Sequence, residues 1–405
     1  MKLQSKQGTA AADVRSRRFF PESLVPRGAR GKLCALAGRE FLVASRSGMS
    51  IHLLDAMARE GFEEVVAIHD GASGLRAFIG IHDTSRGPAF GGIRRWAYRS
   101  EREALRDCLR LSRAMTYKCA LADLPAGGAK IVILDRPDLD VAAAFRHLGR
   151  IIERMAGRLY TGPDLGTGET ELAALARCTA YVTDPGPSGP GELAESTAAG
   201  VYAGIEAALT QVDGTPDWSR RTFVVQGLGE VGSRVARRLV QRGGRVLAAE
   251  IDAGLAERVS AELGLECIDP ASEYDPACDV FVPCALGGIL HDLTLTRLRC
   301  RIVAGGANNV LARALHGDRL HERGILYVPD FVINAGALIR GATFHLQGVR
   351  EPVDSIERRV GRSVARILGL AAEEGLPPAR VAVREAERRL DLAHVGEGGE
   401  DEDTL

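Results

Sequence analysis

The sequence of 405 residues lacks several features that mark whole classes of protein. Its formal net charge is −1, so no basic excess points to nucleic acid or to an acidic membrane surface. No apolar run approaches the roughly 18 residues that a membrane-spanning helix needs. No segment near the N-terminus is apolar enough for a secretory signal peptide. We therefore expect neither a nucleic-acid partner nor a membrane location.

Metal-binding and disulfide patterns are also missing. Eight cysteines are present, but no two are spaced as CxxC, and most lie in apolar surroundings. That is typical of reduced core cysteines in a cytosolic protein. His316 and His321 lie five residues apart, which is not the spacing of a helical metal pair, so we expect them at the surface or between domains. His82 is expected to be structural, and the sequence predicts no metal site. We expect the protein to be cytoplasmic.

The composition, with 45% hydrophobic and 26% charged residues, is that of a globular protein long enough for two domains. The two ends differ from the rest. Residues 1–48 hold ten Lys or Arg against three Asp or Glu, and we expect an extension of doubtful order. A basic organelle-targeting leader is the alternative. Residues 396–405 form an acidic, glycine-rich tail that should stay solvated.

Strand and helix patterns alternate over residues 49–190. The runs "EVVAIHD" and "LRAFIGIHD" predict paired strands, and residues 100–122 predict a helix with Ser100 as its N-cap. The run "GAKIVIL" predicts another strand, and "DVAAAFRHLGRIIERMAG" a helix ended by Gly157. This alternation favours a layered α/β domain.

A second domain is predicted over residues 191–368. After a helix pattern at 195–209, Thr222–Gln226 predicts a strand, Ser233–Arg242 a helix and Arg245–Ala249 a second strand. The turn between the first strand and the helix reads G-x-G-x-x-G, in which the variable positions after the second glycine are Glu230 and Val231. Its three glycines are Gly227, Gly229 and Gly232.

Each glycine answers a physical need of a dinucleotide site. The first allows the tight turn, the second lets the backbone approach a pyrophosphate, and the third lets the helix pack on the strand. The helix N-terminus then offers free N–H groups to the phosphates. A glycine turn of no function is the alternative, but the strand–turn–helix–strand context favours dinucleotide binding. Glu250 ends the second strand, where it can accept bonds from a ribose 2′-OH, and this favours NAD over NADP.

Three charged residues of the first domain are candidates for the chemistry. Lys118 falls at the end of a helix, Lys130 beside a glycine turn and an apolar run, and Asp164 in a Gly/Pro turn. Taken singly, each is as well explained by a surface charge or a capped turn. Together they indicate a site for a carboxylate substrate, in which one ammonium holds the carboxylate. The other, if desolvated near a second cation, would have a lowered pKa and act as a base.

Six motifs in the correct order resemble the Glu/Leu/Phe/Val amino-acid dehydrogenase family, in particular its leucine/valine/phenylalanine branch. The resemblance runs from about Met49 to about residue 390. The motifs are "GIHDTSRGPAFGGIRRW", "MTYKCALADLPAGGAK", "GPDLGTGETEL", "PCALGGIL", "AGGANNVL" and "PDFVINAGALIRG".

The resemblance implies roles for particular residues. Lys130 would be the catalytic residue that activates the water attacking the iminium, Lys118 would grip the substrate carboxylate, and Asp164 would be a proton partner that orders the substrate amine. The positions implied to line the substrate site are Gly91, Gly92 and Met115. Those implied to contact the cofactor are Thr197, Asn309, Cys284, Ala285 and Leu286.

The sequence departs from the leucine branch mainly in "NAGALIRGATFHLQG", which helps to form the side-chain pocket. We predict Phe90, Gly162 and Leu338 as pocket residues. The predicted function is the reversible, NAD-dependent oxidative deamination of a branched-chain L-amino acid to a 2-oxo acid and ammonia. The same reaction on an aromatic amino acid and a catalytically inactive binding relative are the alternatives. The family implies a homo-oligomer, formed through residues 49–190, and helices over residues 369–395 that return towards this first domain.

Overall fold

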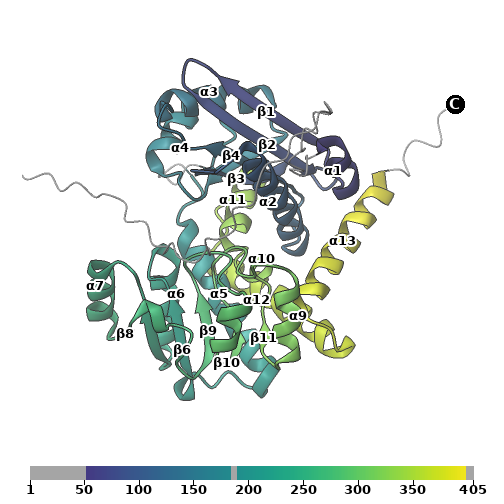
Figure 1. Ribbon diagram of the computed structural model, residues 1–405. Coiled ribbons are helices and arrows are strands. Elements are labelled where there is room, and N and C mark those ends of the chain that lie inside the picture. The colour runs from purple at the N-terminus through teal and green to yellow at the C-terminus, as the bar shows by residue number, and fades with distance from the viewer. Residues whose placement is uncertain (1–51, 184–188, 398–405) are drawn as a thin grey trace, which may run out of the picture. The chain divides into compact units, whose positions relative to one another are not determined.

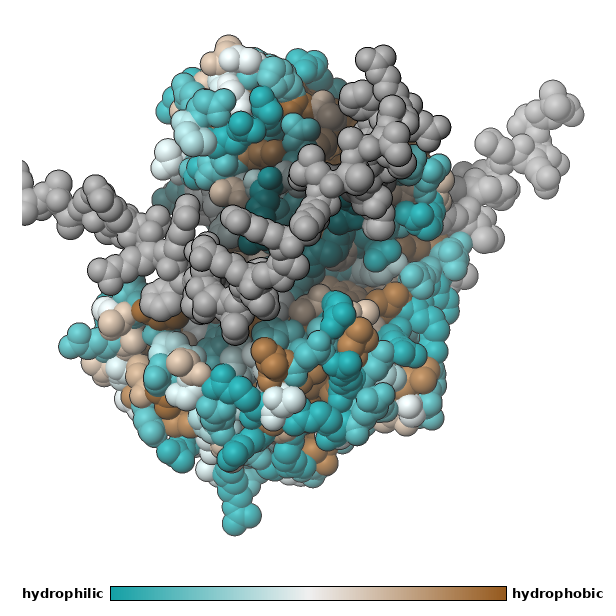
Figure 2. All heavy atoms as spheres, in the orientation of Figure 1, coloured by the Kyte–Doolittle hydropathy of each residue, from teal (hydrophilic) through white to brown (hydrophobic). Residues whose placement is uncertain are grey.

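The computed structural model describes residues 52–183 and 189–397. The predicted extension over residues 1–48 and all but the first two residues of the predicted tail over residues 396–405 lie outside the described part. Within that part, no helix combines the length and the apolarity needed to cross a bilayer. Two separate β-sheets organise the described residues (Figure 1). On the face shown in Figure 2, hydrophilic residues predominate and hydrophobic ones lie in small groups.

The first sheet is mixed. Its strands are β1 (Glu64–Asp70), β2 (Leu75–Asp83), β3 (Ala89–Trp96), β4 (Gly127–Leu134) and β5 (Leu159–Pro163). Their order is β1-β2-β4-β3-β5. Strands β1 and β2 pair antiparallel, which confirms the predicted strand pair, whereas β3 runs parallel to both β4 and β5. The helices of this part are α1 (Leu53–Glu60), α2 (Glu101–Leu121), α3 (Val141–Arg154) and α4 (Glu169–Ala176).

Strand β4 lies between two packing layers, because successive side chains of a strand point to opposite faces of the sheet. Ile131 packs with Phe145 of α3 in one core cluster. Val132 packs instead with Cys108 of α2 in another. Lys130 alternates with Ile131, so its side chain faces the layer of α2.

The predicted helix over residues 100–122 is confirmed in α2. The Ser100 hydroxyl accepts a hydrogen bond from the Glu103 N–H at 3.2 Å, which satisfies one free donor of the first turn. Helix α3 ends at Arg154, earlier than predicted. Ala156 and Gly157 follow it with positive φ, so the chain leaves the helix before the glycine that was expected to end it.

The second sheet is parallel throughout. Its strands are β6 (Thr222–Gln226), β7 (Arg245–Ala249), β8 (Glu266–Ile268), β9 (Cys278–Pro283), β10 (Cys300–Val303) and β11 (Leu326–Tyr327). Their order is β11-β10-β9-β6-β7-β8. The helices of this part are α5 (Leu193–Asp213), α6 (Glu230–Gln241), α7 (Ala253–Leu263), α8 (Asp292–Arg297), α9 (Leu315–Glu322), α10 (Asp330–Ile333) and α11 (Gly336–Gln347). Strands β6 and β7 match the prediction, and α6 begins at Glu230, three residues before the predicted start. The fold class is therefore the predicted one: α/β, with an N-terminal part and a Rossmann-like part.

Two C-terminal helices, α12 (Val353–Glu374) and α13 (Pro378–Glu397), contact both parts. Val360 of α12 belongs to the same core cluster as Val201 of α5. Arg359 of α12 donates to the carbonyl of Ala122 at the end of α2, at 2.9 Å. Figure 1 shows α13 extending from the second sheet towards α1 and α2. The domain limits proposed from the sequence stay a prediction.

Candidate active site

A cavity of about 360 Å³ is lined by residues from both parts of the described chain. Strands β3, β4 and β5 and the end of α2 supply one side, and helices α5, α10 and α11 the other. All residues predicted for catalysis and substrate binding line it: Phe90, Gly91, Gly92, Met115, Lys118, Lys130, Gly162, Asp164 and Leu338. Of the predicted cofactor residues, Thr197, Val231 and Asn309 line it as well. The other predicted cofactor residues lie between β6 and the first turn of α6, directly after β7, and directly after β9: Gly227, Gly229, Glu230, Gly232, Glu250, Cys284, Ala285 and Leu286.

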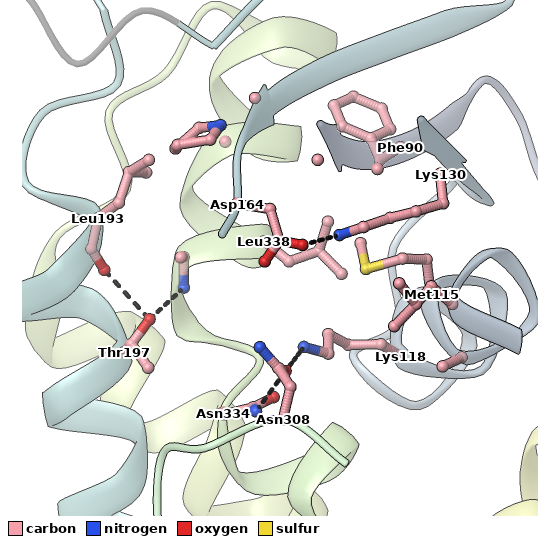
Figure 3. Close-up of a pocket in the computed structure, with 18 of the residues that line it drawn as sticks. Phe90, Met115, Lys118, Lys130, Asp164, Leu193, Thr197, Asn308, Asn334 and Leu338 are labelled. Carbon is pink, nitrogen blue, oxygen red and sulfur yellow. Dashed lines mark hydrogen bonds and ion pairs between the residues drawn. The ribbon is translucent and has the colours of Figure 1, made fainter. Parts of the chain in front are cut away.

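Lys130 is a buried cation with an ionic partner. Its side chain is 7% exposed, and its Nζ lies 2.9 Å from Oδ2 of Asp164. Figure 3 shows Lys130 and Lys118 reaching into the cavity from the same side, with Met115 between them. Burying an ammonium without a partner is costly, so the carboxylate offsets the cost of placing Lys130 in a strand.

Asp164 follows β5 and faces two cations. Its Oδ2 accepts from Nζ of Lys130 and from Nε of Arg94, both at 2.9 Å. Burial raises the pKa of Asp164, but the two cations outweigh it and hold that pKa well below its usual range. Among the described residues, none donates a hydrogen bond to Oδ1. That oxygen is therefore left to accept a donor from a ligand.

Lys118 lies in the last turn of α2 and contacts the opposite side of the cavity. Its Nζ donates to Oδ1 of Asn308 at 3.3 Å, and the same oxygen accepts from Nδ2 of Asn334 at 2.8 Å. Burial lowers the pKa of Lys118 to about 8, although the nearby Asp330 carboxylate opposes the shift. Lys118, the lysine expected to hold the substrate carboxylate, therefore has a lowered pKa. Burial is the main cause, and the nearby positive charge of Lys130 adds to it.

Aromatic rings form one wall of the cavity. The rings of Phe90 and Tyr160 stack with their centroids 4.8 Å apart and an interplanar angle of 5°. His345 of α11 lies 5.0 Å from the Tyr160 ring, and its Nε2 lies 3.1 Å from Oγ1 of Thr183. Burial lowers the pKa of His345, which favours the neutral imidazole. The sequence analysis named Phe90 but missed Tyr160, Thr183 and His345, because their contacts join segments far apart in the chain.

Glycines keep the cavity open and the strands close. A Cβ added at Gly91 would collide with the carbonyl oxygen of Ala129, so this glycine is required by strand packing. A Cβ at Gly162 would lie 3.2 Å from Cβ of Thr183, and one at Gly341 would lie 3.6 Å from its Oγ1. Both glycines thus lie next to Thr183 in the cavity lining, where larger residues would reduce the cavity volume.

The predicted dinucleotide loop has the geometry that its glycines require. Gly227 has a φ of +86°, which favours glycine, and a Cβ on Gly232 would collide with the carbonyl oxygen of Gly227. Nothing lies within 4 Å of a Cβ built on Gly229, so the space beside this backbone is open to a ligand. A Cβ on Gly227 would lie 2.7 Å from that of Ala285, which places the Cys284–Leu286 loop beside the turn. The loop therefore fits a pyrophosphate at the start of α6.

Glu250 lies beside the same loop. Its Oε2 accepts from the N–H of Leu228 at 2.7 Å, and its Oε1 accepts from the N–H of Asp252 at 2.9 Å. Two neighbouring residues expose apolar side chains: Ile251 is 88% exposed and Leu286 is 61% exposed. An acid and two exposed apolar side chains at the carboxyl ends of β7 and β9 suit the ribose and the base of a nucleotide.

Thr197 and Asn309 border the cavity where the two sheets approach it. The Thr197 hydroxyl donates to the carbonyl of Leu193 and accepts from the N–H of Ala337, both at 3.2 Å (Figure 3). These bonds fix the start of α11 against α5. Asn309 has a φ of +53°, a left-handed conformation that asparagine tolerates better than most residues.

His82 and His316 are not among the residues that line the cavity. His82 is buried, with Nε2 donating to the carbonyl of Glu60 at 3.0 Å and Nδ1 lying 2.9 Å from the Thr116 hydroxyl, as expected of a structural residue. His316 was expected at the surface or between domains, but it is buried and lies 3.2 Å from Asp292. Among residues 52–183 and 189–397, no group of three His, Cys, Asp or Glu is arranged to hold a metal ion.

The fold and the site together define an amino-acid dehydrogenase. Residues 62–181 match the family "Glu/Leu/Phe/Val dehydrogenase, dimerisation domain", and residues 189–256 and 249–348 match "Glutamate/Leucine/Phenylalanine/Valine dehydrogenase". The chain belongs to this family, which confirms the resemblance drawn from the motifs. Its members are oxidoreductases that act on the CH–NH2 group of small-molecule substrates with a nicotinamide cofactor.

Particular relatives narrow the comparison without fixing the substrate. Leucine dehydrogenase of Thermoactinomyces intermedius is 40% identical over 84% of this chain and 94% of its own length. Phenylalanine dehydrogenase of Lysinibacillus sphaericus is 37% identical over 81% of this chain and 88% of its own length. Among solved structures, L-tryptophan dehydrogenase from Nostoc punctiforme is similar with a TM-score of 0.73 and 34% identity, over 85% of this chain and 100% of that one.

Proposed function

We propose that the protein catalyses the reversible, NAD-dependent oxidative deamination of a branched-chain L-amino acid to the 2-oxo acid and ammonia. One observation carries this proposal. Lys118, Lys130 and Asp164 line a single cavity that also has apolar and aromatic walls. Two ammonium groups and one carboxylate with a free oxygen match the charges of an amino-acid zwitterion, and the walls suit an apolar side chain.

Each charged residue has a distinct task in this proposal. Lys118 pairs with the substrate carboxylate, which replaces its neutral contact with Asn308. Oδ1 of Asp164 accepts from the substrate amine, while Oδ2 keeps its contact with Lys130. Lys130 removes a proton from the water that attacks the iminium carbon. Lys130 returns this proton to the nitrogen of the carbinolamine, which then loses its hydroxyl proton and expels ammonia to leave the 2-oxo acid.

The cofactor is proposed to be NAD, held by the loop from Gly227 to Gly232. When bound, it accepts the hydride from the substrate Cα. The fit of the loop supports a dinucleotide, and Glu250 supports NAD over NADP. Its carboxylate can accept from a ribose 2′-OH but would repel a 2′-phosphate.

A specific observation favours an aromatic substrate as the second candidate. Gly162 and Gly341 leave the cavity deep at Thr183, and the stacked rings of Phe90 and Tyr160 offer a flat wall. A planar side chain would stack on such a wall. The phenylalanine and tryptophan dehydrogenases among the relatives support this candidate as well.

Initial rates of reductive amination would decide between the candidates. The assay would present the purified protein with ammonia, NADH and each of several branched-chain and aromatic 2-oxo acids, with NADPH as a second cofactor. The highest kcat/KM with a branched-chain acid and NADH supports the proposal. A preference for an aromatic acid would replace the substrate assignment, and no turnover with any of them would favour the inactive binding relative.

We also propose a cytoplasmic homo-oligomer. The free thiols among the described cysteines are what a reducing compartment maintains. The family description of residues 62–181 as a dimerisation domain supports self-association. A similar solved structure, the hetero-hexameric glutamate dehydrogenase from Thermus thermophilus, has 25% identity and a TM-score of 0.70 over 83% of this chain and 90% of that one. Light scattering on the protein eluted from a size-exclusion column would give the mass of the assembly directly. A monomer at assay concentration would contradict the proposed homo-oligomer.

A further inference from the structure

Arg94 is a charged residue of the cavity to which the proposed reaction assigns no task. It lies on β3, lines the cavity and is 15% exposed. Its Nε donates to Oδ2 of Asp164 at 2.9 Å, the oxygen that Lys130 also contacts. Its NH1 donates to Oδ2 of Asp107 at 3.1 Å. The guanidinium is therefore held between two carboxylates, and only one of them faces the substrate.

Asp107 is itself fixed from two further directions. Its Oδ2 accepts from the Tyr98 hydroxyl at 2.7 Å, and its Oδ1 accepts from Arg110 at 2.6 Å. Although burial raises the pKa of Asp107, these donors and Arg94 lower it overall, so the anchor stays ionised. A planar guanidinium bound at two different nitrogen atoms has little freedom to rotate. The result is a fixed cation behind Asp164.

The need for a second cation arises from the proton that Lys130 must exchange. Asp164 faces Lys130 from β4, Arg94 from β3 and Lys118 from α2, with Tyr98 nearby. When Lys130 gives up its proton, Asp164 loses one of its two contacting cations. Burial would then favour the protonated carboxyl, which has lost the charge that holds the substrate ammonium. Arginine cannot be deprotonated in proteins, so Arg94 keeps its charge throughout.

We propose that Arg94 is a positioning residue that keeps Asp164 ionised, with Oδ1 free for the substrate amine, while Lys130 exchanges its proton during turnover. This inference rests on the proposed function, because it needs Lys130 as the base. It concerns the reaction itself, because Asp164 must be ionised whenever its Oδ1 accepts from the substrate amine.

The test is the pH dependence of kcat/KM for amino-acid oxidation by the full chain. Arg94→Met removes a permanent positive charge beside Asp164, so a higher pH is needed to keep the Asp164 carboxyl deprotonated. The acidic limb should move to higher pH by about one unit or more, since a contacting opposite charge shifts a carboxyl pKa by roughly 1–3 units. Arg94→Lys keeps a charge and should bring the limb back towards that of the wild type. A uniform loss of rate with an unmoved limb in Arg94→Met would overturn the inference.

A matched control lies one residue along the same strand. Arg95 points to the opposite face, where it contacts Asp135 at 3.1 Å and Glu171 at 3.4 Å. Arg95→Met removes the same charge and should leave the acidic limb in place, whereas an equal shift would show that overall charge, not Arg94, sets it. NADH binding followed by fluorescence would confirm that each variant is folded.

Asp107→Asn gives a second arm that needs no change at Arg94. It removes a negative charge behind the guanidinium, so the limb should stay in place or move to lower pH while kcat falls. A move to higher pH would overturn the inference even if Arg94→Met failed to fold. A wild-type protein that oxidises no amino acid overturns both this inference and the proposed function. An active wild type whose Arg94→Met variant keeps its acidic limb overturns the inference alone.

Discussion

In the part of the chain built on the first sheet, substrate binding and catalysis are proposed to depend on ionisable side chains. These lie within a helix or strand or directly after one. Lys130 lies in a strand, Lys118 in the last turn of a helix and Asp164 directly after a strand. In the part built on the second sheet, the proposed task is cofactor binding, and it depends mainly on the backbone. The loop from Gly227 to Gly232 has open space beside Gly229, and the carboxylate of Glu250 accepts hydrogen bonds from two backbone N–H groups next to it.

The contrast follows from what each ligand presents. An amino acid is a small zwitterion whose two charges need two fixed opposite charges, and these keep their strength because the site excludes water. A pyrophosphate spreads its charge over several oxygens, and a helix N-terminus meets it with several N–H groups at once. Changes in the first part should therefore alter rate and pH dependence, and changes in the second should alter cofactor choice.

The largest effect is expected at Lys130. Lys130→Ala should reduce kcat on the order of 10²–10⁴-fold, the usual contribution of a positioned acid or base, because water is left without its base. NADH binding should be retained, since the nucleotide loop belongs to the other sheet. Steady-state kinetics with NADH fluorescence would measure both. A near wild-type kcat would make Lys130 a structural charge and remove the main support for the contrast.

Cofactor choice should respond to Glu250 in turn. The wild type should have a higher kcat/KM with NAD than with NADP. Glu250→Gln should reduce the NAD value on the order of tenfold, as expected for one charge-assisted hydrogen bond, and should narrow the preference. Asp252→Asn is the matched control, because Asp252 caps α7 through its bond with the N–H of Leu255. A wild-type preference for NADP would contradict the assignment.

The pH dependence of substrate capture should reveal Lys118. Burial lowers the pKa of this lysine to about 8, so its positive charge is present below that pH and is lost as the pH rises through it. The affinity of the free enzyme for a carboxylate competitive inhibitor should fall above about pH 8, approaching tenfold per unit. Lys118→Arg should flatten this dependence because arginine stays charged. An inhibition constant that does not change between pH 7 and pH 10 in the wild type would contradict the role.

A smaller effect should separate the two candidate substrates. In Gly162→Ala, the added Cβ lies 3.2 Å from that of Thr183 and narrows the cavity. We expect kcat/KM to fall several-fold more for aromatic than for branched-chain 2-oxo acids, since a lost methylene-sized space costs roughly 1–3 kcal/mol. Gly369→Ala in α12 is the control, because its Cβ would have no neighbour within 4 Å. Equal losses for both substrate classes would show that the glycine is needed for folding alone.

The smallest effect is expected at the N-terminus. A chain beginning at Met49 should remain soluble and active, because the family match begins at residue 62 and residues 1–48 are basic and aperiodic. Expression yield and kcat/KM of the shortened chain would be compared with those of the full chain. Loss of soluble protein on shortening would show that the extension belongs to the folded protein.

Local signals in the sequence determined much of the fold. Ser100 followed by Glu103 fixed the start of α2, and the glycine spacing fixed the turn between β6 and α6. Such features depend on residues a few positions apart, so a single sequence contains them. The three charged candidates were found in the same way, since each stands in a short, unusual context. Their convergence on one site was an expectation drawn from the three charges taken together and from the resemblance of the family motifs.

The tertiary structure alone decided which groups meet across the chain. Arg94 and Arg95 read alike in "GGIRRW", yet strand alternation sends one to Asp164 and the other to Asp135. His316 was expected at the surface or between domains, and it is buried in contact with Asp292 of α8. Burial lowers the pKa of Lys118 to about 8, and this burial involves segments far away in the sequence, since its hydrogen-bond partner Asn308 is 190 residues further on. Electrostatic effects follow distance in space and burial, and a sequence gives neither until the chain has folded.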